Sequence, residues 1–342
     1  MVSKYAFVGF GNPLLDMSIR DGEEVLKKYE LKPNDAILAE EKHLSIYKHI
    51  VDNYDVTYVA GGASQNTSRC AQYILPENST VYFGAVGEDD LAKQLRAAND
   101  REGLRSAYQV KEGVPTGSCA VVITGHDRSL CTNLGAAEKF DKSHLDSPEL
   151  QEILNNGKFF YMEGYFLTHG LETALIVAKK AKETGATFAI NLSAPFIPQF
   201  FSSQLDQILP YTSIVIGNES EAETYAGSHD ISSTDLPTVA KAIANFASEL
   251  PSSVKRRVIL THGAEPSVLA VQGEEKTTSF PVKPIDNIVD TNGAGDAFAG
   301  GVLGALFLEQ PIEKAIEAGN TLGGLCIGQN GPVLPHPKVQ VL

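Results

Sequence analysis

Short apolar runs alternate along the chain with longer amphipathic segments, and this pattern defines the expected fold. Several runs rich in β-branched and aromatic residues are predicted to be strands: YAFVGF (5–10), VTYVA (56–60), TVYFGAV (80–86), CAVVIT (119–124), FFYMEGYFL (159–167), TFAINL (187–192), SIVIGN (213–218) and RVILTHG (257–263). In the second half these runs alternate with helix-like segments: ETALIVAKKAKETG, FFSSQLDQIL, ESEAETYAG and LPTVAKAIANFASEL. Such alternation predicts βαβ units, and therefore an α/β fold with a mostly parallel sheet flanked by helices.

Two regions interrupt this alternation with extended pieces that lack full-length crossover helices. The second contains TGSCAVVITGHDRSLCTNLGA, whose two polar-tipped strands around GHDR predict a β-hairpin. We expect the two regions to form one small β-rich lid, made of residues 17–61 and 113–137. The remaining residues, 1–16, 62–112 and 138–342, are expected to form one large α/β domain.

The charge balance narrows the class of partner. The 342 residues include 28 Lys and Arg against 42 Asp and Glu, which gives a formal net charge of −14. This acidic balance argues against a nucleic-acid partner or an anionic membrane surface. It is compatible with a phosphate ligand, because backbone N–H groups and Mg²⁺ can hold phosphate locally.

Cysteine spacing and hydropathy bear on the cellular location. Cys70, Cys119, Cys131 and Cys326 are far apart and form no CxxC pair, so neither a disulfide framework nor a zinc site is expected. The apolar stretch at the amino terminus is too short for a signal peptide, and the apolar run near 302–308 is far below the roughly 20 residues that span a bilayer. We expect a cytoplasmic protein, with the nucleus as the alternative.

The stretch VDTNGAGDAFAGG (289–301) carries the clearest chemistry. Gly293, Ala294 and Gly295 precede an expected helix start, where N–H groups at the positive end of the helix can hold an anion. A carboxylate beside such a pocket, that of Asp296, suits phosphoryl transfer to an alcohol, because the base accepts the hydroxyl proton while the N–H groups hold the charge. The alternative is that Asp296 merely occupies a first helical turn and the glycines serve helix packing. The motif alone leaves both interpretations open.

Other nucleotide motifs are absent from the sequence. It contains no GxxxxGK[ST] loop, no HRD and DFG pair and no HExxH helix. GFGNPL (9–14) begins like a dinucleotide fingerprint, but Leu14 stands where the third glycine is needed. A nicotinamide-binding oxidoreductase is therefore disfavoured.

Two spaced signatures indicate a family. DTNGAGDAFAGG resembles the carboxy-terminal signature of the ribokinase-like (PfkB) carbohydrate kinases, and GGASQNTSRCAQYIL (61–75) resembles the amino-terminal one. Five further stretches resemble the members that phosphorylate adenosine: GNPLLDMS, LKPNDAILAE, PTGSCAVVITGHDRSLCTNLGAA, NLSAPFIPQF and GNESEA. The resemblance implies a ribokinase-like fold, transfer of the ATP γ-phosphate to the 5′-hydroxyl of adenosine, Mg²⁺ as cofactor and a role in purine salvage.

The resemblance also implies roles for individual residues around the reacting groups. It makes Asp296 the general base and assigns the γ-phosphate anion hole to Gly293, Ala294 and Gly295. Arg128, in GHDRSL, would reach towards the transferring phosphate and stabilise its charge. Its alternative is a solvated charge at the tip of the hairpin.

For the nucleoside, the resemblance assigns Asp16 to the 2′- and 3′-hydroxyls, since two carboxylate oxygens can accept from a vicinal diol. The alternative for Asp16 is a turn or helix-cap aspartate. Further ribose-pocket residues implied by the resemblance are Asn12, Gly62 and Asn66. The positions implied to enclose the purine are Leu38, Leu134, Ala136, Phe166 and Phe196, each of which could instead be core or lid packing. Departures from the family pattern are Ala63, where many relatives have Ser, and Ala36, where some have Gln.

On the ATP side, Asn218 and Glu221 match an N-x-x-E motif that the family associates with Mg²⁺ and phosphate, with Glu221 acting through water. The same spacing is that of a helix capping box, and both roles are compatible. Residues implied to lie near the nucleotide are Thr261, Gly263 and Asn292.

Two alternatives to an adenosine-phosphorylating enzyme remain at this stage. One is a related nucleoside or sugar kinase, for example one acting on inosine or guanosine. The other is a catalytically silent nucleoside-binding sensor, which the intact Asp296 and its glycines disfavour. We expect the protein to be a monomer.

Overall fold

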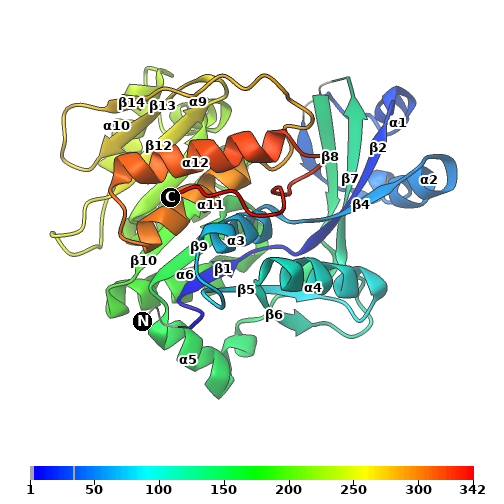
Figure 1. The fold of residues 1–342 in the computed structure, drawn as a ribbon, viewed down its shortest axis with the longest axis horizontal. Helices are drawn as coiled ribbons and strands as arrows, with labels where there is room; N and C mark the ends of the chain where they lie inside the picture. Colours follow the sequence, from blue (N-terminus) through cyan, green and yellow to red (C-terminus); the bar gives the residue numbers. More distant parts are fainter. Residues whose placement is uncertain (1–3, 34, 126) are drawn as a thin grey trace.

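The computed structural model describes residues 4–33, 35–125 and 127–342, and these form two sheets of very different size (Figure 1). His126, in the predicted hairpin turn, lies outside the described residues. Within the described ranges the larger sheet has nine strands in the order β14-β13-β12-β11-β10-β9-β1-β5-β6. Their bounds are β1 Phe7–Phe10, β5 Thr80–Val86, β6 Arg105–Val110, β9 Phe159–Glu163, β10 Thr187–Asn191, β11 Ile214–Asn218, β12 Arg257–His262, β13 Glu265–Val271 and β14 Thr278–Phe280.

The larger sheet is parallel from β6 to β12 and ends in the antiparallel strands β13 and β14. Its central strands are apolar on both faces, as in β5, where all seven residues of TVYFGAV are buried. Continuous apolar strands are typical of a parallel sheet that is covered by helices on both sides. The predicted α/β class, with helices flanking a mostly parallel sheet, is confirmed.

Two helical layers cover the larger sheet. One face packs against a core formed with α5, α6, α8, α9 and α10, and the opposite face packs against α3, α11 and α12. The helix bounds are α3 Ala63–Ile74, α4 Asp90–Glu102, α5 Pro148–Asn156, α6 Leu167–Thr184, α7 Phe196–Phe200, α8 Ser202–Ile208, α9 Glu219–Ser228, α10 Leu236–Ala244, α11 Ala294–Phe307 and α12 Ile312–Ile327. Short 3-10 turns are η1 Glu41–His43, η2 Gly135–Lys139, η3 Lys142–Asp146, η4 Gly164–Phe166 and η5 Leu209–Tyr211.

The smaller sheet projects from the edge of this body, on the right of Figure 1. Its strand order is β3-β8-β7-β2-β4, with bounds β2 Leu14–Arg20, β3 Ala36–Leu38, β4 Thr57–Gly61, β7 Gly117–Thr124 and β8 Asp127–Asn133. The short helices α1 (Glu23–Lys28) and α2 (Ile46–Asn53) bury one of its faces. Because β2 begins at Leu14, Asp16 lies in the smaller sheet and not on the large-domain side of the predicted boundary. We therefore propose a lid that begins at Leu14 and not at residue 17; its movement stays a prediction.

The glycines inside α11 have a packing function. A Cβ at Gly300 would lie 2.7 Å from the Thr67 carbonyl oxygen of α3, and one at Gly301 would lie 2.6 Å from the Ala318 carbonyl oxygen of α12. Only glycine permits backbones to approach this closely. The packing interpretation therefore holds for Gly300 and Gly301, which bring the middle of α11 close to α3 and α12.

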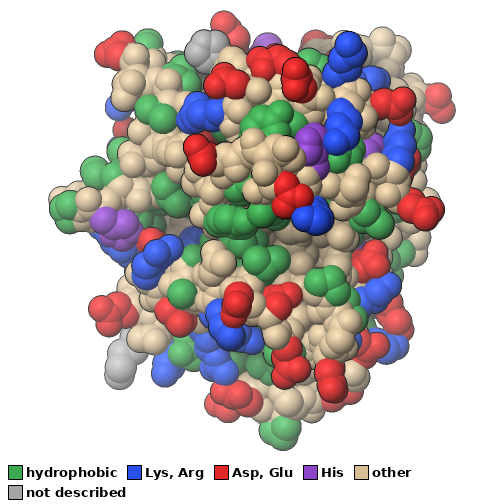
Figure 2. All heavy atoms as spheres, turned by 90° about the vertical axis from the view of Figure 1, so that its right-hand side faces the viewer, with side chains coloured by type: hydrophobic (Ala, Val, Ile, Leu, Met, Phe, Trp, Pro, Cys, Tyr) green, Lys and Arg blue, Asp and Glu red, His purple; other side chains and the backbone are tan. Residues whose placement is uncertain are grey.

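The face that carries the smaller sheet has acidic and basic side chains interspersed over it (Figure 2). Within the described ranges, none of the helices combines the length and the apolar character needed to cross a membrane.

Candidate active site

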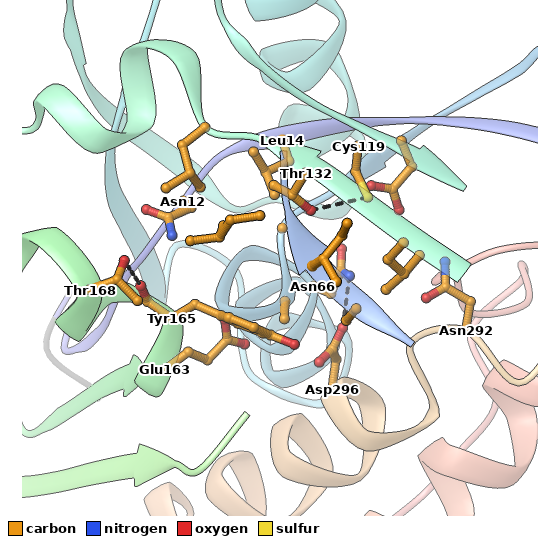
Figure 3. A pocket seen from close by; sticks show the side chains of 18 of the residues that line it. Asn12, Leu14, Asn66, Cys119, Thr132, Glu163, Tyr165, Thr168, Asn292 and Asp296 are labelled. Atoms are coloured by element: carbon orange, nitrogen blue, oxygen red, sulfur yellow. Dashed lines mark hydrogen bonds between the residues drawn. The ribbon is translucent and has the colours of Figure 1, made fainter. Parts of the chain in front are cut away.

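Two adjoining cavities lie where the smaller sheet meets α3 and α11. The inner one is a partly open cavity of about 760 Å³, a volume that includes its mouth, with β2, β3, β7 and β8 on one side and α3, η4, α7 and α11 on the other (Figure 3). The outer one is a cleft of about 2210 Å³ that includes its open mouth. Asp296, Glu163 and Asn292 line both cavities, so these residues lie at the junction.

Most of the site residues implied by the sequence line one or both cavities. Those lining the inner cavity are Asn12, Asp16, Leu38, Gly62, Asn66, Leu134, Phe196, Asn292 and Asp296. Those lining the outer cleft include Arg128, Asn218, Glu221, Thr261, Gly293, Ala294 and Gly295. Residues separated by more than 200 positions in the sequence thus meet in one site, where the first turns of α3 and α11 face the smaller sheet.

The turn before α11 presents the positive end of that helix to the outer cleft. Gly293 is the N-cap residue, with a left-handed φ of 78°, and a Cβ there would lie 2.4 Å from Cβ of Pro332. Ala294 and Gly295 form the first turn of the helix, and Asp296 is its third residue. An anion in the cleft would therefore meet both the helix dipole and an adjacent carboxylate.

Asp296 is held by a hydrogen bond from the neighbouring helix. Asn66 Nδ2, on α3, donates to Asp296 Oδ2 at 2.8 Å (Figure 3). Burial raises the pKa of Asp296 to about 6, and this rise is limited by the Asn66 hydrogen bond and by the charge of Arg69. The carboxyl is therefore mostly ionised at pH 7 and is close to the pKa suited to a general base.

A second carboxyl at the junction, Glu163, was missed from the sequence. It ends β9, its side chain is 4% exposed, and its Oε1 has no hydrogen-bond partner among the described residues. Burial and the charge of Asp296 hold the pKa of Glu163 well above its usual range. The available signal was a charged residue at the carboxyl end of the apolar run FFYM, since ligands bind at that edge of a parallel sheet.

Asp16 lies in the inner cavity as a buried strand residue. Its carboxyl packs directly against Gly61, where a Cβ would lie 2.3 Å from Asp16 Oδ1. Burial raises its pKa to about 7, while Arg69 lowers it and Asp296 raises it further. Because Asp16 belongs to β2, the turn and helix-cap alternatives for this residue are excluded.

Asn12 has an unexpected partner, His169 of α6. The two side chains meet with His169 Nε2 at 2.9 Å from Asn12 Oδ1. Burial lowers the pKa of His169 to about 4, so the ring is neutral at pH 7 and Nε2–H is the donor to the amide oxygen. The Asn12 amino group is therefore available to donate a hydrogen bond to another acceptor.

The apolar end of the inner cavity differs from the expected set at two positions. Phe166 does not line either cavity; it is 1% exposed and packs in the core against the rings of Phe140 and His169. Its neighbour Tyr165 lines both cavities instead, because adjacent residues of a helical turn point in different directions. Ala136 is fully buried in η2 and is also outside the lining. The purine roles of Phe166 and Ala136 stay predictions that the cavity lining does not support.

Arg128 is anchored at the cleft and is not a solvated charge at the tip of the hairpin. It forms an ion pair with Asp290, and both side chains are largely buried. Asp290 also accepts hydrogen bonds from the backbone N–H of Asn292 at 2.7 Å and of Gly331 at 3.0 Å. The pair therefore ties β8 of the smaller sheet to the loop that leads into α11.

The N-x-x-E motif forms a complete capping box at the start of α9. Asn218 Oδ1 accepts from the Glu221 backbone N–H, and Glu221 Oε2 accepts from the Asn218 backbone N–H, both at 2.9 Å. Burial raises the pKa of Glu221 to about 7. Gly263 lies outside both cavities, in the exposed turn between β12 and β13, so its assignment to the nucleotide is not supported.

The architecture and the junction of the two cavities define a phosphotransferase class. The chain belongs to the pfkB family of carbohydrate kinases, whose family model matches residues 26–339. It is 54% identical to the adenosine kinase of Schizophyllum commune, with 100% of both chains covered.

The chain is also similar to solved structures of adenosine kinases, in both sequence and fold. The Anopheles gambiae adenosine kinase in complex with P1,P4-di(adenosine-5) tetraphosphate is 41% identical, with a TM-score of 0.93 and with 95% of this chain and 96% of that chain covered. The Schistosoma mansoni adenosine kinase in complex with 2-fluoroadenosine is 33% identical, with a TM-score of 0.94 and 98% of each chain covered.

Proposed function

We propose that this protein is an ATP-dependent phosphotransferase that transfers the γ-phosphate of ATP to the 5′-hydroxyl of adenosine. The products are AMP and ADP, and the reaction is one of purine salvage. The observation that carries the proposal is the position of Asp296, at the junction between the inner cavity and the outer cleft, which receives the positive end of α11. The full-length similarity to adenosine kinases supports adenosine as the acceptor.

The inner cavity has the chemistry that a nucleoside requires. Asp16 offers two acceptor oxygens to the 2′- and 3′-hydroxyls of the ribose, while Asn12, Gly62 and Asn66 complete the polar end. At the other end, Leu38, Leu134 and Phe196 enclose a flat heterocycle together with Tyr165. A simple sugar has no group to fill this apolar end, which favours a nucleoside over a sugar as substrate.

In the reaction, Asp296 accepts the proton of the 5′-hydroxyl as the oxygen attacks the γ-phosphorus. A new O–P bond forms while the bond from the γ-phosphorus to the bridging β,γ-oxygen breaks, and ADP leaves with that electron pair. The N–H groups of Gly293, Ala294 and Gly295 stabilise the charge on the transferring group, together with Arg128. Closure of the smaller sheet over the nucleoside excludes water from the reacting groups.

The outer cleft fits a nucleotide whose phosphates carry Mg²⁺. Among the residues that the structure describes, no three potential metal-ligating side chains cluster, so the phosphates and water would provide most of the ligands. Glu221 retains free lone pairs beyond its capping bonds and would contact the ion through water. When bound, Mg²⁺ neutralises phosphate charge. Thr261 and Asn292 line the same cleft and would lie near the nucleotide.

The test is an ADP-release assay with ATP, Mg²⁺ and a panel of adenosine, inosine, guanosine and ribose. We expect turnover with adenosine to exceed that with the other acceptors. Preference for another acceptor would indicate a related kinase, and adenosine binding without ADP release would indicate a sensor. The monomeric state and the cytoplasmic location stay predictions.

A further inference from the structure

A buried cation, Arg69 on α3, lies behind the candidate base. The side chain is 6% exposed, and its guanidinium donates to three neutral oxygens. These are the Ala60 carbonyl at 2.6 Å, Asn99 Oδ1 at 3.2 Å and Asn66 Oδ1 in a short contact. Removing a guanidinium from water is costly, and neutral hydrogen-bond partners compensate that cost poorly. The burial of a cation at this position therefore requires an explanation.

The hydrogen bonds around Asn66 have only one consistent direction. A guanidinium can only donate, so Asn66 must accept through Oδ1. Its Nδ2 is thereby committed as a donor, and it donates to Asp296 Oδ2 at 2.8 Å (Figure 3). Arg69, Asn66 and Asp296 therefore form a directed relay from the buried cation to the candidate base.

The close packing of α3 against α11 keeps this relay short. Gly300 permits the two helices to touch, since a Cβ there would collide with Thr67 and Cys70 of α3. Asn66 and Arg69 are three residues apart and lie on the same face of α3. The relay is therefore built into two of the most tightly packed helices of the fold.

Several titratable groups face the charge of Asp296 from the elements packed around it. They are Cys70 of α3, Asp16 of β2, Tyr161 and Glu163 of β9, Tyr165 of η4, Glu221 of α9 and Cys326 of α12. Charged groups in the same region are Arg69 of α3, Arg128 of β8 and Asp290 of the loop before α11. Burial raises the pKa of each cysteine and tyrosine, so these groups are neutral at pH 7.

Among the acids, Asp296 and Glu163 form the decisive pair. Glu163 is buried and Asp296 is half-buried, but Asp296 receives the Asn66 hydrogen bond, whereas Glu163 Oε1 has no partner among the described residues. The pKa of Asp296 rises only to about 6, and Arg69 and Asn66 are the groups that lower it. The pKa of Glu163 lies well above its usual range. Of the two carboxyls, Asp296 is therefore the one that carries the charge.

We infer that Arg69 is a positioning residue for phosphotransfer: through Asn66 it aims the Asp296 carboxylate and selects it over Glu163 as the ionised member of the pair. This inference rests on the proposed function for its catalytic meaning. The relay itself is a property of the unliganded protein and can be measured without turnover.

The experiment compares Arg69→Met, which removes the charge and the donors, with Arg69→Lys, which keeps the charge. In Arg69→Met we expect the acid limb of the kcat–pH profile to move upward by about one pH unit or more, with a kcat at pH 6 lower by about fivefold or more. Arg69→Lys should keep the limb close to that of the wild type. The matched control is Gln72→Met, on the same helix, whose buried amide bonds to Thr80 and not to Asn66.

An unshifted acid limb in Arg69→Met would overturn the inference, because a purely structural role lowers stability without moving the limb. If Arg69→Met does not fold, Asn66→Ala breaks the same relay and leaves the Arg69 bonds to Ala60 and Asn99, and it should shift the limb in the same direction.

A second readout is ¹³C NMR of labelled aspartate, in which the Asp296 signal is identified by its loss in Asp296→Asn. Its titration midpoint should rise in Arg69→Met. Failure of the wild type to phosphorylate adenosine would reject the proposed function, whereas this titration still decides the relay.

Discussion

Replacing Asp16 by Asn should weaken nucleoside binding and at the same time stabilise the unliganded protein. The carboxyl is buried against Gly61, and Asn has nearly the same shape, so the substitution leaves the packing intact. It removes the charge that would accept hydrogen bonds from the ribose diol. Hydrogen bonds to a charged group contribute about 1.5–3 kcal/mol each, so the affinity for adenosine should fall about 10- to 100-fold.

The gain in stability follows from the pKa of Asp16. Burial raises it from 3.8 to about 7. Between these values the native protein keeps a proton that the unfolded chain has released, so the wild-type free energy of unfolding decreases as the pH rises through this window. Each pKa unit corresponds to about 1.36 kcal/mol, which gives a cost of up to ~4 kcal/mol at pH 8. Asp16→Asn avoids this cost.

The assay is urea unfolding of the unliganded wild type and variant at pH 5 and pH 8. We expect Asp16→Asn to be more stable than the wild type by up to ~4 kcal/mol at pH 8, with over half of that advantage absent at pH 5. Asp55→Asn, at an exposed aspartate, is the control and should change little at either pH. A stability difference that is equal at pH 5 and pH 8 would refute the reasoning, because it would not arise from ionisation of Asp16. Calorimetric titration with adenosine and 2′-deoxyadenosine completes the test, since the variant should discriminate less between them.

Four further predictions concern the base, the helix contact and the apolar slot. Asp296→Asn should lower kcat by about 10²–10⁴ in the ADP-release assay while calorimetry finds adenosine affinity nearly unchanged; near-normal turnover would remove Asp296 from its role. In the wild type, kcat should decrease as the pH falls through about 6, because protonated Asp296 cannot accept the hydroxyl proton, and a flat profile down to pH 5 would contradict this. Gly300→Ala should cost about 1–3 kcal/mol in denaturant unfolding through the collision with α3, whereas Gly227→Ala, where a Cβ meets nothing within 4 Å, should not. Tyr165→Ala should raise the KM for adenosine more than Phe166→Leu does, and the reverse order would restore Phe166 to the purine slot.

Several features of the structure could be predicted from the sequence because they depend on local patterns of residues. The apolar runs at 80–86 and 187–192 contain β5 and β10, because strands buried on both faces must be apolar throughout. The turn before Asp296 could be inferred because a helix start with flanking glycines has a local chemical meaning. The hairpin of β7 and β8 was likewise predictable, because its two strands can be recognised in the sequence on either side of GHDR.

Other features depend on the direction of a side chain, which the sequence does not specify. Tyr165 and Phe166 are adjacent aromatic residues, and only the start of α6 after η4 decides that Tyr165 faces the cavity while Phe166 enters the core. In the same way, the Asn218–Glu221 spacing was compatible with a helix cap, a metal contact or both. The cap is present, and the metal contact stays a proposal.

By itself, the sequence determined the α/β class and the membership of the family, and it indicated Asp296 as the candidate base, because each follows from short-range patterns of residue type. The tertiary structure decided which groups surround that carboxylate. Glu163, Asn66, Arg69 and Asp16 come from three separate elements, and their meeting depends on how closely α3 can approach α11 and on how the smaller sheet, which contains β2, lies against the larger domain. Their pKa values arise from mutual distance and burial, which are properties of the packed chain and not of any segment within it.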